Sequence, residues 1–234
     1  MPANRVDGQP AFVLHAYPFS ETSLIVEAFS RDFGRVALLA RGARRPRSAL
    51  RGVLMAFQPL ELSWAGKGEV KTLMKAEWQG GQPLLSGRAL FCGYYLNELL
   101  LGLLPREDAH TGLFPVYAET LRRFADGAEE ADIRRFERDF LRELGYGLTL
   151  KHDADGRPID AAAAYIYEIE RGPAPAGENR PANAVSGQTL IDLDAGDFSD
   201  PRTRLEAKQL MRALIAHYTG GKGLETRRIF MELS

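Results

Sequence analysis

The stretch "RGARRPRSALRG", residues 41–52, holds five arginines and no acidic residue. These are Arg41, Arg44, Arg45, Arg47 and Arg51. A guanidinium stays charged at neutral pH and binds phosphate through a planar fork of donors, so such a cluster is typical of a nucleic-acid contact. A solvated, mobile loop that aids solubility is the alternative interpretation of the same charge run.

Cations and aromatic rings on neighbouring segments favour the nucleic-acid hypothesis. The further residues that we predict to bind nucleic acid are Arg35, Lys67, Lys71 and Lys75. Trp64 and Trp78 are candidates to stack on bases, because a sheet with a basic rim and exposed rings is a common surface for single strands. Some of the aromatic rings must instead fill the protein core, and the sequence does not separate the two groups.

A second basic pattern occurs further along the chain. Arg134, Arg138 and Arg142 recur every four residues, which aligns them along one face of a helix. They form either a solvated face paired with nearby acids or a receptor for a carboxylate or acidic peptide beside an apolar groove.

Patterns that would indicate catalysis or a metal site are missing. The four histidines are widely separated, and the single cysteine, Cys92, lies in the most apolar predicted helix. "DADG" at 153–156 lacks the other ligands of a calcium loop, and "TGGKG" at 219–223 lacks the first glycine of a P-loop. We therefore expect no metal, no cofactor and no enzymatic activity, and a hydrolase with an unrecognised site is disfavoured.

The first 80 residues must position the arginine cluster, and they indicate a small β-barrel. Five β-rich runs occur, at residues 11–17, 24–30, 35–42, 60–66 and 70–78. In the last run, alternation predicts one face made of Val70, Thr72, Met74, Ala76 and Trp78. Five short strands without crossover helices favour a five-stranded OB-fold barrel, although an SH3-like barrel would give a similar pattern.

The remainder of the chain has helical periodicity. Helices are predicted over residues 88–104, 114–127, 131–144 and 201–218, whereas residues 151–202 form a short irregular insertion that contains one candidate strand, "AYIYEIE". The fold class is therefore α+β multidomain. We expect an OB-fold domain at residues 1–80 and an all-α helical domain with this insertion at 84–234.

The charge distribution separates the same two regions. The 234 residues are 45% hydrophobic and carry a net charge of −1, but residues 1–80 carry eleven Lys and Arg against seven Asp and Glu. One half is thus suited to a polyanion. The chain shows neither a secretory signal nor a membrane span, so we expect a cytoplasmic location and no membrane partner.

Six sequence blocks resemble the RecO family of bacterial recombination mediators. They are "PAFVLHAYPFSETSL" at 10–24, "GRVALLARGAR" at 34–44, "GKGEVKTL" at 66–73, "YLNELL" at 95–100, "RRFERDFLRELGYG" at 134–147 and "YTGGKGLETR" at 218–227. The blocks come in the family's order with similar spacing across nearly the whole chain. Many family members carry a four-cysteine zinc motif, but this chain has no cysteine after Cys92, so the resemblance implies the type without zinc.

The resemblance implies a function in DNA repair and DNA recombination after DNA damage. Family members bind single- and double-stranded DNA, anneal complementary strands, and act with RecR to load RecA onto DNA coated by single-stranded-DNA-binding protein. They recognise the acidic, hydrophobic C-terminal tail of that coat protein. The residues that would receive the tail here are Arg134, which would hold its terminal carboxylate, with Arg135, Arg138, Phe136, Phe140 and Leu141.

Periodicity places the two phenylalanines and the leucine of this set on the core side of their helix.

The resemblance also implies action at the nucleoid. An RNA-binding OB protein, and a tail-binding adaptor whose barrel is only scaffold, remain the alternative functions.

Overall fold

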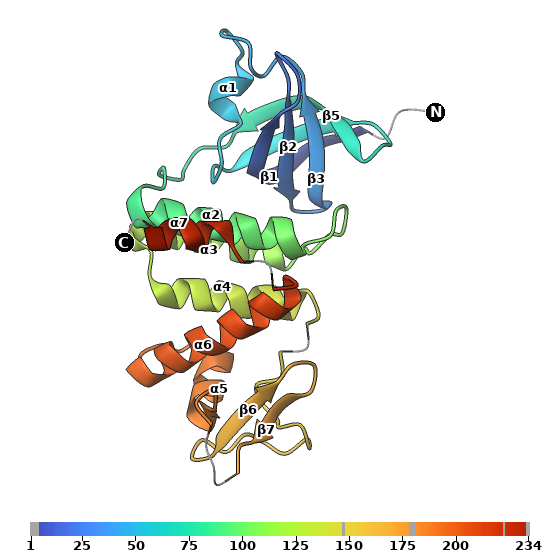
Figure 1. The fold of residues 1–234 in the computed structure, drawn as a ribbon. Coiled ribbons are helices and arrows are strands. Elements are labelled where there is room, and N and C mark those ends of the chain that lie inside the picture. The colour runs from blue at the N-terminus through green and yellow to red at the C-terminus, as the bar shows by residue number, and fades with distance from the viewer. Residues whose placement is uncertain (1–4, 147, 178–180, 222, 233–234) are drawn as a thin grey trace. The chain divides into compact units, whose positions relative to one another are not determined.

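Five strands close into a barrel in the computed structural model of this protein, which describes residues 5–146, 148–177, 181–221 and 223–232. The chain forms two compact units. We call Met1–Ala128 together with Leu224–Ser234 the barrel unit, and Glu129–Gly223 the helical unit. Figure 1 shows the elements of both.

The barrel confirms the predicted OB-like fold. Its elements are β1 (Arg5–Pro18), β2 (Leu24–Ser30), β3 (Gly34–Ala40), α1 (Leu50–Val53), β4 (Leu60–Ala65) and β5 (Val70–Trp78). The strands close in the order β1-β2-β3-β5-β4, with antiparallel pairs except for β3 and β5. The predicted strand runs correspond to these five strands, each of which is a short run rich in apolar residues.

The side-chain alternation of β5 is interrupted. The register between β4 and β5 shifts between Ser63 and Trp64, where β5 has one extra residue relative to β4, as in a β-bulge. Leu73 is consequently buried against the barrel core, whereas Met74 and Trp78 are exposed. Strict alternation over the run was therefore the wrong expectation.

Helices cover the outer face of β1 and β2. Besides the short α1, the described helices of the barrel unit are α2 (Gly87–Leu103), α3 (Leu113–Gly127) and α7 (Glu225–Glu232). The ring of Phe29 on β2 packs 5.5 Å from Phe114 and 5.8 Å from Tyr117 on α3. The Asn97 amide on α2 donates a hydrogen bond to the Leu14 carbonyl on β1 at 2.8 Å. Tyr117 is fully enclosed by this packing, and burial raises the pKa of its hydroxyl above the ordinary value.

The helix α7 returns to α2 from the far end of the chain, and Figure 1 shows the two side by side. The Glu98 carboxylate on α2 accepts hydrogen bonds from the backbone N–H groups of Glu225 at 2.7 Å and Thr226 at 3.0 Å. A carboxylate at a helix N-terminus satisfies donors that have no partner within the helix.

The helical unit contains a small sheet inside the segment that we expected to be irregular. Its elements are α4 (Glu130–Glu143), β6 (Ala164–Glu168), β7 (Gly172–Pro175), β8 (Val185–Ser186), α5 (Gly187–Ala195) and α6 (Pro201–Tyr218). The sheet order is β7-β6-β8, and α4, α5 and α6 pack on one another. The predicted domain boundary at residues 80–84 follows the end of β5. Helices α2 and α3 nevertheless form one compact unit with the barrel.

Candidate nucleic-acid interface

The arginine segment, residues 41–52, follows β3 at one end of the barrel. Gly42 adopts a φ of +68°, a left-handed conformation that favours glycine, and so turns the chain out of β3. Ala43, Leu50 and Val53 pack toward the barrel core. The segment is therefore attached by its apolar residues, which leaves its charged side chains outside.

All five predicted arginines of this segment are exposed. Only Arg44 has a side-chain hydrogen bond to a described group, and its acceptor is a neutral carbonyl, Ser20 O, at 2.7 Å. Within the described residues, none of the five forms an ion pair with an acidic side chain. Their positive charge is thus available to a phosphate backbone.

Arg44 connects this segment to the turn between β1 and β2, residues 19–23. Its backbone N–H donates to Thr22 O at 2.9 Å, in addition to the side-chain bond to Ser20 O. The register explains the proximity, because Pro18 pairs with Leu24 on β2 and Leu24 pairs with Ala40 on β3. The ends of three strands therefore bring the arginines and this turn together.

Aromatic rings stand exposed at the same end of the barrel. Tyr17 is 45% exposed and Phe19 is 60% exposed, and the rings of His15 and Tyr17 lie 4.3 Å apart. The sequence interpretation missed these three residues, although His15 and Tyr17 share one face of a strand and the "YPFSE" stretch is aromatic and turn-forming. Exposed rings beside unpaired arginines can stack on bases and hold phosphates together.

The two tryptophans have different surroundings. Trp64 is 1% exposed and belongs to the barrel core, so it cannot stack on a ligand. Trp78 is 59% exposed, and its indole N–H donates to Gln58 Oε1 at 3.1 Å. Of the two tryptophans, Trp78 is therefore the one that is available as a surface ring.

Two of the other predicted cations have protein partners in this structure. Arg35 lies beside the buried carboxylate of Glu27, at 3.9 Å, and donates to the Leu101 carbonyl; its burial lowers the pKa of its guanidinium. Lys71 bonds to Glu107 and, at 3.2 Å, to the Gly68 carbonyl. The Arg35 side chain thus bonds to α2, whereas that of Lys71 bonds to the connection between α2 and α3, and the assignment of both residues to DNA stays a prediction.

Lys67 and Lys75 are exposed. Among the described residues, no hydrogen bond or ion pair joins either side chain to the arginine segment. Lys67 lies in the turn that leads from β4 into β5. The first residue of β5 after this turn, Val70, pairs with Ala37 in the middle of β3. The arginine segment follows the last residue of β3, so the turn lies away from it. Lys75 forms an ion pair with Glu77 at 2.8 Å.

In the helical unit, the basic stripe of α4 contacts the chain's own helix α5. Arg138 donates to the carbonyls of Leu193 at 3.1 Å and Asp194 at 3.0 Å, and Arg142 pairs with the Asp194 carboxylate at 2.8 Å. Arg135 donates to the Gly196 carbonyl at 3.0 Å. Cations are favourable at a helix C-terminus, where carbonyls have no partner within the helix.

The other residues predicted to receive a protein tail lie in the interior. The Arg134 guanidinium lies 2.7 Å from the Glu137 carboxylate, with 8% and 0% of these side chains exposed. The apolar members of the set, Phe136, Phe140 and Leu141, are all buried. The tail site stays a prediction, and its most accessible predicted member is Arg135, whose side chain is 34% exposed.

Comparison with known proteins identifies the family. The family model described as recombination protein O N terminal matches residues 7–81, and the one described as recombination protein O C terminal matches residues 84–228. The chain belongs to the recombination protein O family. It is 66% identical to a DNA repair protein RecO of Dechloromonas aromatica, with 98% of this chain and 97% of that protein covered.

Other members of the RecO family are also similar over their length. The DNA repair protein RecO of Aromatoleum aromaticum is 59% identical, with 98% of this chain and 97% of that protein covered. That of Ralstonia nicotianae is 49% identical, with coverage of 98% and 86%. Membership confirms the resemblance and places this chain among DNA repair and recombination proteins.

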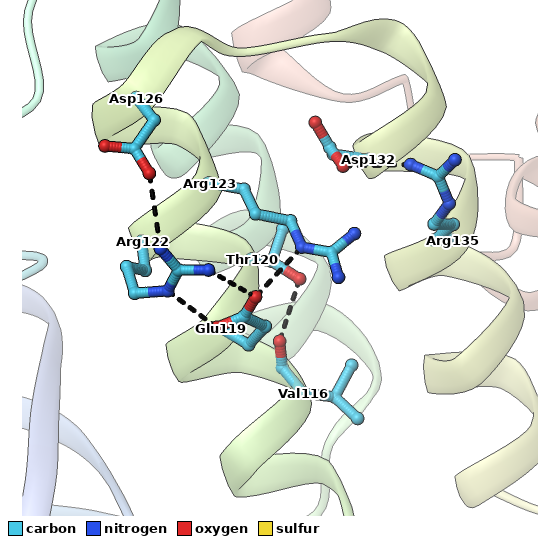
Figure 2. Close-up of polar contacts among 8 residues, drawn as sticks. All are labelled: Val116, Glu119, Thr120, Arg122, Arg123, Asp126, Asp132 and Arg135. Carbon is cyan, nitrogen blue, oxygen red and sulfur yellow. Dashed lines mark hydrogen bonds and ion pairs between the residues drawn. The ribbon is translucent and has the colours of Figure 1, made fainter.

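This RecO-family chain also carries a network of charges on α3, which Figure 2 shows. The Glu119 carboxylate accepts hydrogen bonds from Arg122 at 2.8 Å and Arg123 at 3.0 Å, and Arg122 reaches Asp126 at 3.2 Å. The two guanidinium groups lower the pKa of Glu119 to about 2. These arginines are therefore partly neutralised, unlike those of residues 41–52.

No three His, Cys, Asp or Glu side chains of the described part of the chain gather where they could hold a metal ion. No helix in it has the length and apolar character needed to cross a membrane.

Proposed function

We propose that this protein is a non-enzymatic recombination mediator that binds single- and double-stranded DNA through the arginine segment of its barrel. It anneals complementary strands and helps to load RecA onto DNA coated by single-stranded-DNA-binding protein. The observation that carries the proposal is the set of five exposed arginines without acidic partners among the described residues, beside exposed aromatic rings.

Annealing by such a surface requires no covalent chemistry. Two complementary strands repel each other through their phosphates, and arginines that neutralise one strand lower that repulsion. Phosphate contacts leave the Watson–Crick edges of the bases free to pair. A protein of this kind therefore accelerates a reaction that the bases themselves drive.

Two protein partners belong to the proposal, the C-terminal tail of single-stranded-DNA-binding protein and RecR. An acidic tail is complementary in charge to the arginines of α4. The most exposed of these arginines are Arg135, which belongs to the predicted tail site, and Arg142, which lies next to that site on the helix. The expected place of action is the cytoplasm, at the nucleoid.

A strand-annealing assay with complementary labelled oligonucleotides tests the proposal. We expect the wild-type protein to accelerate annealing, and the variant R41Q/R45Q/R47Q to lose most of this acceleration. These three arginines have no side-chain hydrogen bond to a described group, so the change removes charge and leaves the bonds of Arg44 intact. Equal acceleration by both proteins would contradict the proposal.

The control has the same change in charge at arginines that already have acidic partners. Arg5, Arg31 and Arg157 are exposed and pair with Asp7, Asp32 and Asp155 respectively. R5Q/R31Q/R157Q should therefore anneal strands almost as the wild type does. Repeating the assay on strands coated with single-stranded-DNA-binding protein tests the mediator step, and competition with matched RNA separates the RNA-binding alternative.

A further inference from the structure

The end of β1 and the turn that follows it expose aromatic rings that the barrel has no need to expose. The other large rings of these two strands, Phe12 and Phe29, are buried at 3% and 0% exposure. Tyr17 and Phe19 are instead 45% and 60% exposed, and they stand at the barrel end that carries the arginine segment.

We propose that Tyr17 and Phe19 stack on unpaired bases and make this surface selective for single strands, so that the duplex formed by annealing leaves it. This inference rests on the proposed function, since it concerns the same surface. It adds the strand state that the surface prefers and the means by which the product is released.

The two kinds of side chain respond differently to the state of the DNA. Arginines contact phosphates, which both single strands and duplexes present. Aromatic rings contact the flat faces of bases, and these faces are hidden in a duplex because each base stacks on its neighbours. When two strands pair on the protein, the stacking contacts are lost while the phosphate contacts persist, so the affinity falls after the reaction rather than before it.

The turn is held in place before any ligand binds. The Arg44 backbone N–H and guanidinium bond to the Thr22 and Ser20 carbonyls, and the Phe19 N–H donates to Ser23 O at 3.1 Å. The ring of Tyr17 is supported by His15 at 4.3 Å between ring centroids. A surface that is already ordered pays little entropy when it binds.

Arg44 also links the arginine segment to the backbone beside Phe19. Its guanidinium bonds to the residue directly after Phe19, so one cation lies within a residue of an exposed ring. The pair of Phe19 and Arg44 therefore suits a nucleotide of an unpaired strand, whose base and phosphate are both accessible.

The test measures the affinity of the full-length variant Y17A/F19A for a labelled oligo(dT) strand and for a hairpin duplex of similar charge. Loss of one stacked base lowers single-strand affinity by about tenfold. We expect a loss of this order for each ring on oligo(dT), and an unchanged affinity for the duplex. An equal loss on both ligands, or no loss on oligo(dT), would overturn the inference.

Two further variants keep the result interpretable. Y17L/F19L retains apolar bulk without a π-face, so it should behave like the alanine variant if stacking is the cause and like the wild type if general apolar contact is. F33A removes a ring of 38% exposure from the turn between β2 and β3, at the opposite end of these strands, and should leave the ratio of the two affinities unchanged.

The outcome for the proposed function can be distinguished from that for this inference. If R41Q/R45Q/R47Q binds both ligands as tightly as the wild type, the proposed function fails. If that variant loses affinity for both ligands while Y17A/F19A keeps the wild-type ratio, only the inference about the rings fails.

Discussion

The salt dependence of DNA binding is the sharpest quantity that the structure supplies for the arginine segment. A protein that neutralises Z phosphates of a single strand has a slope of log K against log salt of about −0.7Z. Contact of each of the five exposed arginines with one phosphate gives a slope of about −3.5. In R41Q/R45Q/R47Q two of these arginines remain, so the slope becomes about −1.4.

These slopes correspond to large differences in measured affinity. Between about 50 and 200 mM salt, the wild-type affinity for oligo(dT) should fall about 130-fold and that of the variant about sevenfold. The two proteins therefore differ most at low salt and converge as salt rises. Fluorescence anisotropy titrations at four or more salt concentrations, with the thermal midpoint of each protein recorded, provide both slopes.

The refuting result is a variant whose slope equals that of the wild type, since it would show that these arginines do not replace counterions on DNA. The R5Q/R31Q/R157Q protein is the control for net charge. It should keep the wild-type slope because its arginines already have carboxylate partners. A reduced slope in this control would mean that net charge, and not the arginine segment, determines binding.

Two further predictions concern the scaffold. Gly34→Ala should lower the free energy of unfolding by about 2–5 kcal/mol, because φ is +61° there and an added Cβ would lie 1.9 Å from the Asp108 carbonyl oxygen. Calorimetry checks this against Gly52→Ala, where nothing lies within 4 Å of an added Cβ. Equal thermal midpoints of the two variants would contradict the prediction. The pKa of Glu119 is lowered from 4.5 to about 2, so its stabilising contribution is complete above pH 4.5 and is lost as the pH falls through about 2. Glu119→Gln should therefore flatten the fall of the thermal midpoint over this acid range, and an unchanged curve would show that the network adds nothing.

Local patterns in the sequence were sufficient for the barrel and most helices, because each strand is a short apolar-rich run between turns and each predicted helix has its own period. They failed where a distant segment decides the outcome. Leu73 is buried in place of Met74 only because the register with β4 shifts beside Trp64. No periodicity within β5 contains that information.

In the candidate site, too, local and distant contacts differ in how far the sequence predicts them. The exposed arginines of residues 41–52 could be predicted since no acid lies near them in the sequence. Arg35 could not be assigned to a structural role, because its partners Glu27 and Leu101 are distant in sequence and come together only in the fold. Likewise, the spacing of Arg138 predicted a basic stripe, but the α5 carbonyls that occupy it come from residues 193–194.

The cap that Glu98 places on α7 has a consequence for the order in which the protein folds during translation. The barrel unit is built from residues 1–128 and 224–234, whereas the helical unit is one continuous stretch between them. At roughly 5–20 residues per second, the ribosome needs about 5–20 s to cross that stretch. During this time the nascent barrel unit lacks its last helix, so α2 presents an uncovered surface and an unoccupied Glu98 while the helical unit is still being made.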